Sequence, residues 1–304
     1  MTLAVQQVIG DETLARVFVG TLDDGSRVEF VESVQPPVAR SEKWVLIVST
    51  LKGCPVGCPI CDAGGDFRGR LTADEILAQI GHLVRSRWPD GRAQTRRVKI
   101  QFARMGDPAF NDAVIDVLER LPGALELPGL MPCVSTVAPV GRDAWFAALA
   151  RVKKARFGRG RFQMQFSLHT TDAEARRRLI PIRTWGFEEM AAFADSFFEP
   201  GDRLMTLNFA PASGYPLEPE LLAPHLSPER FAIKLTPINP TFAATESGLS
   251  GLIDPADDEA CARVVERFEA LGYTTILSIG ALAENAIGSN CGQYVEKLRR
   301  ALPA

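Results

Sequence analysis

Three cysteines fall within eight consecutive positions of this chain, in the run Cys54-Pro55-Val56-Gly57-Cys58-Pro59-Ile60-Cys61. Thiolates this close in sequence can converge on one inorganic centre, and clustered cysteines are typical ligands of iron–sulfur clusters. A four-iron cluster with three cysteine ligands leaves one iron open, and an open metal position can bind and activate a ligand. A zinc site would need a fourth ligand, but no second C-x2-C and no H-x3-H motif is present. The spacing therefore predicts an iron–sulfur site, with an incomplete zinc site or three unconnected thiols as alternatives.

Length and composition fit one soluble catalytic domain. The chain has 304 residues, of which 46% are hydrophobic and 23% are charged. Its net charge of −3 lacks the basic excess that a dedicated nucleic-acid binder uses to neutralise phosphates. The first residues lack the pattern of a signal peptide, and no apolar run is long enough to span a bilayer. We therefore expect a cytoplasmic protein with no membrane partner.

The N-terminal residues predict a small β-hairpin. Residues 14–19 and 27–31 form two strand-like runs around the turn signal Asp23-Asp24-Gly25. We expect residues 1–42 to form an extension that carries this hairpin. Residues 43–49 are almost continuously apolar, which is typical of a parallel strand that is buried on both faces.

Strands and helices alternate along the rest of the chain. The capping box Thr72-Ala73-Asp74-Glu75 predicts the start of a helix. Regular alternation favours parallel βαβ units, so we expect an α/β fold with a partial (β/α)6 barrel over residues 43–275 and a C-terminal segment at 276–304. Further strands are expected near 97–103, 130–136, 161–168, 203–210, 230–236 and 273–279, and further helices near 110–121, 143–152, 186–198, 217–225, 256–271 and 291–301.

Polar residues follow several of these strands, at the sheet edge where ligands of α/β proteins gather. Gly106-Asp107-Pro108 follows the second strand, and its carboxylate can accept hydrogen bonds from an ammonium group. Later strands are followed by Ser135, by Ser167 and His169, and by Asn239, which add hydroxyl, imidazole and amide groups. Taken singly, Gly-Asp-Pro is also an ordinary turn and His169 could cap a helix. The series at successive strand ends favours one shared ligand site.

These motifs together resemble the radical S-adenosylmethionine (SAM) superfamily, and within it the RlmN/Cfr methyltransferases, which methylate adenine carbons in RNA. The resemblance runs from about residue 14 to residue 294. Its motifs appear in the family's order: the cysteine run, Leu71-Thr72-Ala73-Asp74-Glu75-Ile76, Met105-Gly106-Asp107-Pro108, Val134-Ser135-Thr136, Ser167-Leu168-His169, Ile180-Pro181-Ile182, Pro237-Ile238-Asn239-Pro240 and Asn290-Cys291-Gly292-Gln293.

The resemblance implies cofactors and residue roles. It implies that the three cysteines bind a [4Fe–4S] cluster whose open iron chelates SAM and cleaves it reductively to a 5′-deoxyadenosyl radical. It assigns SAM contacts to Asp107, Ser135, Ser167 and Asn239, with His169 beside them. Asp107 stands where the family has glutamate, so the charge is kept on a shorter side chain. A low-potential electron donor such as flavodoxin or ferredoxin is implied as a partner.

The family uses two further cysteines, and this chain matches one of them. Cys291 matches the methyl carrier, which one SAM methylates and a second SAM converts into a carbon radical that adds to the substrate. A buried small hydrophobic residue is the alternative role for Cys291. The cysteine whose thiolate resolves the protein–substrate adduct corresponds to Ile47 here. Another group such as Cys133 could take that role, the substrate could let the adduct collapse, or the radical could serve a different reaction.

Two departures from the family bear on the substrate. The RNA enzymes carry a basic N-terminal domain, for which the residues before Lys43 leave no room. The basic residues that precede their C-terminal cysteine are replaced here by the stretch 278–285, so affinity for phosphates should fall. The basic run at 151–156 is interpreted as a solvated helix end.

We therefore expect a radical SAM methyltransferase that acts through Cys291 on an altered substrate, which can be a small molecule, a peptide or an RNA. The alternative is a different hydrogen abstraction from a small molecule or peptide, without methyl transfer. A barrel that keeps its cluster only as a redox or regulatory element is disfavoured, because the positions of the SAM contacts are intact.

Overall fold

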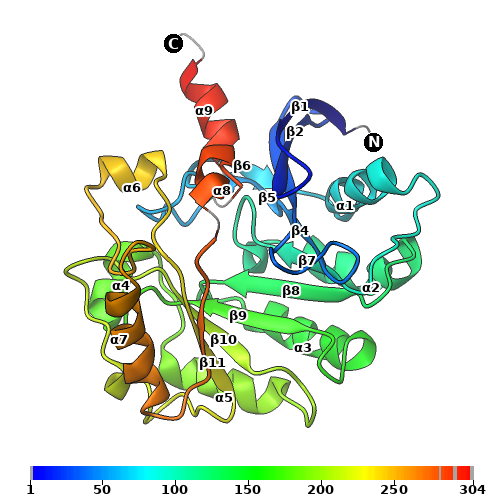
Figure 1. Cartoon of the computed structure of the whole chain (residues 1–304). Helices are drawn as coiled ribbons and strands as arrows, with labels where there is room; N and C mark the ends of the chain where they lie inside the picture. The colour runs from blue at the N-terminus through cyan, green and yellow to red at the C-terminus, as the bar shows by residue number, and fades with distance from the viewer. Residues whose placement is uncertain (1–2, 281, 290–292, 302–304) are drawn as a thin grey trace.

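A ten-stranded sheet forms the centre of the molecule (Figure 1). The computed structural model describes residues 3–280, 282–289 and 293–301. From β4 onwards the neighbouring strands are parallel and follow one another in chain order. The sheet has β1 and β12 as its two edges and does not close, which confirms the predicted partial barrel. The parallel strands are β4 (Trp44–Val48), β7 (Val98–Phe102), β8 (Met131–Thr136), β9 (Gln163–Ser167), β10 (Met205–Phe209), β11 (Phe231–Leu235) and β12 (Thr275–Leu277).

The N-terminal hairpin belongs to the same sheet. Strands β2 (Ala15–Thr21) and β3 (Arg27–Ser33) pair as predicted around a turn with Gly25 in the left-handed region (φ 80°). A strand that the sequence did not predict, β1 (Ala4–Gly10), adds to the outer edge of β2. β3 pairs with β4 in antiparallel register, so the ladder of hydrogen bonds continues from the hairpin into the barrel.

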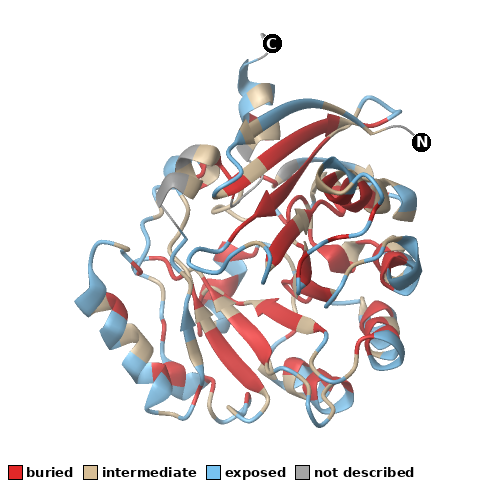
Figure 2. Cartoon of the chain, turned by 45° about the vertical axis from the view of Figure 1, so that its right-hand side comes forward, coloured by how far each residue is buried: buried red, intermediate tan, exposed pale blue. Residues whose placement is uncertain are grey.

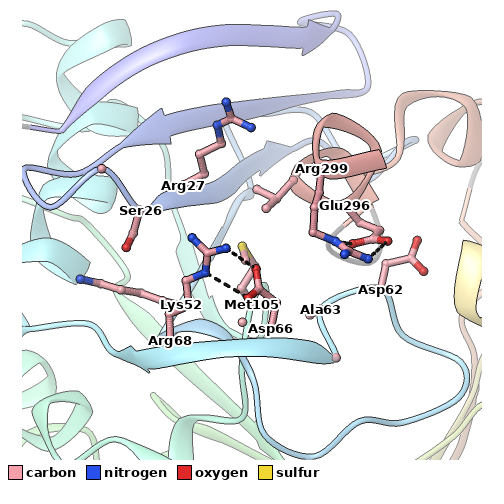
Figure 3. Close-up of a pocket in the computed structure, with 14 residues that line it drawn as sticks. Ser26, Arg27, Lys52, Asp62, Ala63, Asp66, Arg68, Met105, Glu296 and Arg299 are labelled. Atoms are coloured by element: carbon pink, nitrogen blue, oxygen red, sulfur yellow. Dashed lines mark hydrogen bonds and ion pairs between the residues drawn. The ribbon is translucent and has the colours of Figure 1, made fainter. Parts of the chain in front are cut away.

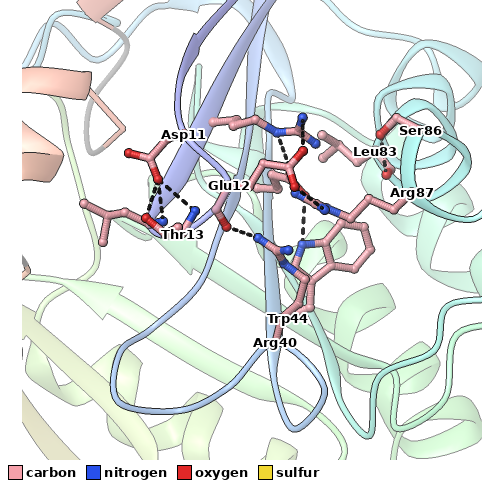
Figure 4. A network of polar contacts seen from close by, with 11 residues as sticks. Asp11, Glu12, Thr13, Arg40, Trp44, Leu83, Ser86 and Arg87 are labelled. Carbon is pink, nitrogen blue, oxygen red and sulfur yellow. Dashed lines mark hydrogen bonds and ion pairs between the residues drawn. The ribbon is translucent and has the colours of Figure 1, made fainter.

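A buried network of charges fixes the hairpin against helix α1 (Ala73–Arg87), as Figure 4 shows from close by. The Glu32 carboxylate accepts hydrogen bonds from Arg16, Arg87 and the Trp44 indole. Burial alone would raise the pKa of Glu32, but the hydrogen bonds and charge of Arg87 and Arg16 outweigh it and hold that pKa below its ordinary value. This buried charge is therefore fully compensated.

Helices cover one side of the parallel strands, and the predicted helices are present with one exception. The region 217–225 contains only the 3₁₀ turn η2 (Pro219–Leu221), because Pro224 cannot donate the backbone hydrogen bond that a longer helix would need at that position. Short helices that the sequence did not predict are α4 (Ala173–Leu179), α6 (Phe242–Glu246) and α8 (Leu282–Ile287). The others are α2 (Ala113–Ala124), α3 (Asp143–Arg156), α5 (Phe187–Phe197), α7 (Asp258–Glu269) and α9 (Gln293–Ala301). Among the described residues, none of these helices is long and apolar enough to cross a membrane.

The two faces of the parallel strands differ in chemistry. The face toward the helices contributes apolar side chains to one large buried core, including Leu46, Ile100, Phe102, Val134, Phe166, Leu207 and Ile233. In Figure 2 these strands are largely coloured as buried, whereas the outward sides of the helices are exposed. Successive side chains of a strand point to opposite faces, and the alternate positions form the concave face: Ile47, Lys99, Gln101, Cys133, Ser135, Gln165, Ser167, Asn208 and Lys234. β4 is apolar on both faces, as predicted, but its neighbours are polar on the concave face.

Candidate active site

Hydrogen bonds anchor the cysteine loop at both ends. It connects β5 (Leu51–Cys54) and β6 (Gly65–Arg70), a small antiparallel pair that the sequence did not predict. Before the loop, the backbone of Leu51 donates to the carbonyl of Met105 beyond β7, at 3.1 Å. After it, the Asp62 carboxylate accepts from two backbone N–H groups, Phe242 at 3.1 Å and Ala243 at 2.9 Å, at the start of α6. The loop therefore links the first strands of the barrel to the last ones.

Gly106 shows how closely the loop approaches the strand ends. Its backbone is left-handed (φ 86°), and a Cβ atom added there would lie 2.4 Å from the side chain of Leu51. Only glycine fits such a position. The Gly106-Asp107-Pro108 turn is thus shaped by its contact with the cysteine loop.

The sequence-predicted residues that the structure describes meet at one cavity of about 270 Å³. It lies between the cysteine loop and the carboxyl ends of the parallel strands. Eight predicted residues line it: Cys54, Cys58, Cys61, Asp107, Ser135, Ser167, His169 and Asn239. The ninth, Cys291, lies outside the described residues.

The cysteines sit in partly apolar surroundings that suit a cluster. Val56, Leu179 and Ile180 form a small buried cluster against Cys54 and Cys58. Burial raises the pKa of Cys54 to about 11 and that of Cys58 to about 12, so the thiolates need a positive partner such as iron. No disulfide joins the five described cysteines.

The thiols do not converge on the position of a single ion. Within the described part of the chain, no group of three His, Cys, Asp or Glu side chains surrounds a point where one metal ion could bind. A mononuclear zinc site would require such a group. A [4Fe–4S] cluster attaches its cysteines to different irons, so it does not require three ligands around one point.

Asp107 is a buried carboxylate with three donors from its own chain. The donors are the hydroxyl of Thr136 at 2.7 Å and the backbone N–H groups of Val137 at 2.6 Å and Ala109 at 2.9 Å. Burial raises the pKa of Asp107 to about 6, although these hydrogen bonds work in the opposite direction. A carboxylate has about four acceptor sites, so one remains for a ligand. A cationic group in the cavity would compensate its charge.

His169 presents a neutral imidazole to the cavity. Its Nδ1 accepts a hydrogen bond from the backbone N–H of Ala210 at 3.1 Å, which leaves the proton on Nε2. Burial, aided by the charge of Arg176, lowers the pKa of His169 to about 4. The alternative that His169 caps the next helix is wrong, because Asp172 caps α4.

The cavity also contains residues that we did not predict. Asn208 and Lys234 line it from neighbouring positions of β10 and β11, and Arg104 lines it from the end of β7. The sequence carried a signal for the first two, because β10 and β11 alternate apolar and polar residues as Met-Thr-Leu-Asn-Phe and Phe-Ala-Ile-Lys-Leu. An alternating parallel strand has one face that is not packed by helices.

Arg104 links the cavity to the C-terminal segment. It forms a buried ion pair with Glu29 at 3.1 Å and donates to the carbonyls of Gly288 at 2.7 Å and Ser289 at 2.6 Å. Glu29 accepts from the backbone N–H of Tyr294 at 3.3 Å. One buried ion pair thus binds residues on both sides of the segment 290–292.

A second hollow of about 310 Å³ lies between the turn of the N-terminal hairpin, the β5–β6 pair and α9 (Figure 3). Lys52, Arg68 and Asp66 line it together with Glu296 and Arg299 of α9. Arg68 pairs with Asp66, and Arg299 pairs with Glu296. Of the predicted site residues that the structure describes, none lines this hollow.

Known proteins are similar to this chain in sequence. A probable dual-specificity RNA methyltransferase RlmN of Frankia alni is 31% identical over 296 residues, which cover 93% of this chain and 65% of that protein. The corresponding protein of Desulfitobacterium hafniense is 27% identical, with 96% of this chain and 78% of that protein covered. The chain spans only 57% of the relative from Frankia casuarinae and 46% of one from Prochlorococcus marinus. No protein-family model matches the chain.

Solved structures share its fold. A radical SAM methyltransferase from Sphaerobacter thermophilus matches with a TM-score of 0.73 at 22% identity, covering 96% of this chain and 80% of that one. SuiB of Streptococcus suis, bound to S-adenosylmethionine, matches with a TM-score of 0.54 at 14% identity, covering 79% and 51% of the two chains. These likenesses show the partial barrel that radical SAM proteins use.

Proposed function

We propose that this chain, which is similar to RlmN proteins over most of its length, is a radical SAM methyltransferase with Cys291 as its methyl carrier. One observation carries the proposal: residues from the cysteine loop and from the ends of five parallel strands line a single cavity. The family's cofactors are a [4Fe–4S] cluster and SAM, which when bound supply a radical that abstracts hydrogen.

Each predicted site residue of the cavity has a proposed role. Cys54, Cys58 and Cys61 hold the cluster. The remaining acceptor site of Asp107 receives the ammonium group of SAM, whose positive charge offsets the burial of the carboxylate. The rest of SAM is bound by hydroxyl, amide and imidazole side chains of the same cavity, which belong to Ser135, Ser167, Asn239 and His169.

The described neighbours of Cys291 support its role. Arg104 lines the cavity and also binds the carbonyls of Gly288 and Ser289, which precede this cysteine in the chain. Glu29 binds the backbone of Tyr294, which follows it. An anchor of this kind would keep a methyl carrier near the strand ends.

One observation favours the alternative, a hydrogen abstraction without methyl transfer. Ile47 packs against a small apolar cluster of Ala15, Val17 and Val31, so no thiolate stands at the position where the family resolves its adduct. Cys133 lies on the same face, two strands away in the same cross-strand row, and is our candidate for a substitute. Its Sγ accepts a hydrogen bond from Gln165 at 2.6 Å.

Partners and location follow from the same proposal. The relatives are named as RNA methyltransferases, whereas for this chain we propose an altered substrate. The cluster would need a low-potential electron donor such as flavodoxin or ferredoxin. The proposed location is the cytoplasm, because a low-potential cluster can stay reduced there.

The first experiment tests the cofactors. Protein reconstituted anaerobically with iron and sulfide and given a strong reductant should convert SAM to 5′-deoxyadenosine. The variants Cys54→Ala, Cys58→Ala and Cys61→Ala should lose this activity, while Cys261→Ala, in α7 away from the cavity, should keep it. SAM cleavage by a variant that lacks all three loop cysteines would refute the cluster assignment.

The second experiment decides between the two reactions. Mass spectrometry of protein isolated from cells should find one methyl group on Cys291, and none on Cys133 or Cys261. An unmethylated Cys291, together with full activity of Cys291→Ala, would favour the alternative reaction. Methylated protein that accumulates as a covalent adduct with substrate would indicate that resolution is slow without a thiolate at position 47.

A further inference from the structure

Two lysines on the concave face of the sheet have no negative partner. Lys99 of β7 is only 9% exposed, and Lys234 of β11 is half-buried and lines the cavity. Within the described residues, neither ammonium group has a hydrogen-bond acceptor or an ion pair. Burial and the charge of Lys99 lower the pKa of Lys234 below its ordinary value, so the two groups are close enough to repel each other.

The surroundings of Lys234 are polar but neutral. In the sheet register, Asn208 lies beside Lys234 on one side of β10 and beside Ser167 on the other. The Asn208 amide donates to Gln165 at 2.8 Å and to Ser135 at 3.3 Å, while its Oδ1 is buried without a partner. A buried polar atom without a partner costs free energy, which a ligand in the cavity would recover.

No acidic side chain stands on the concave positions of β7 to β11 in the described structure. The cavity's carboxylate, Asp107, lies beyond the end of β7 and already accepts three hydrogen bonds. Within the described residues, Lys99 and Lys234 are therefore positive charges without a compensating partner on this face. Burying charge without compensation is costly.

Elsewhere in this protein, the charge of a buried structural lysine is compensated. Lys153 of α3 has a side chain that is 1% exposed, and its ammonium group donates to the Phe197 carbonyl at 3.0 Å and to Glu199 at 3.1 Å and also pairs with Asp202. The charge of Lys153 is thus neutralised within the fold. The absence of any such partner at Lys99 and Lys234 indicates that their partner comes from a ligand.

We propose that Lys99 and Lys234 bind the anionic group, a phosphate or a carboxylate, of a small substrate on the concave face of the sheet. This inference rests on the proposed function, in which that substrate accepts the methyl group. It favours a small molecule over an RNA, because an extruded nucleotide enters an active site with its neutral base and leaves its phosphate outside.

SAM also carries a carboxylate, so its position matters. Lys234 lies two residues before Thr236, which also lines the cavity, and five before Asn239. Lys234 lies in the same cross-strand row as Asn208 and Ser167, next to residues that we assign to SAM, whereas Lys99, at the start of β7, lies deeper in the sheet. A substrate held below SAM would reach these lysines, with the cysteine loop above it.

The experiment measures the binding of inorganic phosphate and of acetate to the reconstituted protein, with saturating SAM and constant ionic strength. At least one of these anions should bind and raise the thermal midpoint. Lys99→Met and Lys234→Met should weaken that binding about tenfold or more, as expected for hydrogen bonds to a charged group. The control is Lys154→Met, an exposed lysine of α3 that should bind the anion like the wild type. Tighter binding of phosphate indicates an organic phosphate as substrate, and tighter binding of acetate indicates a carboxylic acid.

Two further readouts separate the inference from its competitors. Without an anion, Lys234→Met should be at least as stable as the wild type, since it loses an uncompensated charge; a marked loss of stability would mean that Lys234 is structural and would overturn the inference. A tenfold loss of SAM affinity in Lys234→Met would assign this lysine to SAM and would also overturn it. Intact SAM cleavage without anion binding would refute this inference alone, whereas anion binding without SAM cleavage would refute the proposed function.

Discussion

The two faces of the same parallel sheet follow different rules. Toward the helices, residues such as Ile100 and Phe166 are fully buried in a continuous apolar core. On the concave face, their neighbours Lys99 and Gln165 are polar. Buried apolar area stabilises a fold, whereas buried polar groups cost free energy unless they are satisfied. The helix side of the sheet therefore stabilises the fold, whereas the concave side remains available for ligands.

Buried charges also differ between the structural parts of the protein and the concave face. Glu32 and Lys153 lie outside the cavity, and each is surrounded by groups of opposite charge or matching polarity. Lys99 and Lys234 share no such partner in the described structure. Compensation within the fold therefore marks a structural charge here, and its absence marks a ligand site.

The largest expected effect separates activity from stability. Cys58→Ala should abolish reductive cleavage of SAM, because two thiolates cannot hold the cluster in place. The unfolding free energy of the apoprotein should change by about 1 kcal/mol or less, as for removal of one small buried group. Deoxyadenosine assays and urea unfolding check the two parts. A large loss of stability in this variant would break the distinction between the two faces.

The next effect lies on the helix side. Phe166→Ala should lower the free energy of unfolding by about 3–5 kcal/mol, because it leaves a cavity among the rings of Phe146, Trp185 and Phe193. Urea unfolding of the apoprotein measures this loss. The control is Gln165→Ala, the preceding residue on the concave face, which should cost clearly less. Equal losses at the two positions would show that both faces contribute alike to stability.

A comparison of two lysines sharpens the rule for charges. Lys153→Met should destabilise the protein by about 3 kcal/mol, because it leaves the buried Asp202 carboxylate without its partner. Lys234→Met should be neutral or stabilising in the absence of an anion. Thermal and urea unfolding of both variants in one buffer give the answer. If Lys234→Met lost as much stability as Lys153→Met, compensation would not distinguish the two sites.

The smallest effect concerns the rim of the cavity. Asp107→Ala should weaken SAM binding by about 1.5–3 kcal/mol if the carboxylate contacts the ammonium group. Calorimetric titration of SAM into the reconstituted protein measures the loss. Asp112→Ala, an exposed carboxylate that follows the same turn, provides the control. Unchanged affinity in Asp107→Ala would place this residue among the purely structural carboxylates, since its three hydrogen bonds already join β7 to β8 and η1 (Pro108–Phe110).

Features of this protein that depend on local spacing could be predicted from its sequence. The cysteine run, the alternation of strands and helices, and the polar residues at strand ends are all visible as short-range patterns. Parallel strands bring their carboxyl ends to one edge, so these patterns were enough to predict which residues would share a cavity. The same patterns gave a wrong prediction at 217–225, where Pro224 interrupts the helix that the apolar residues suggested.

The compensation of each buried polar group depends instead on contacts between distant parts of the chain. Lys153, in a basic run that we interpreted as a solvated helix end, is buried because α3 faces Asp202 of a distant loop. Lys99 and Lys234 look no different in sequence, yet the fold places both on the concave face, where the charge of Lys99 helps to lower the pKa of Lys234 and no described carboxylate pairs with either. The energy of a charge depends on its burial and on the groups opposite it. Those groups come from remote parts of the chain, and no local spacing encodes them.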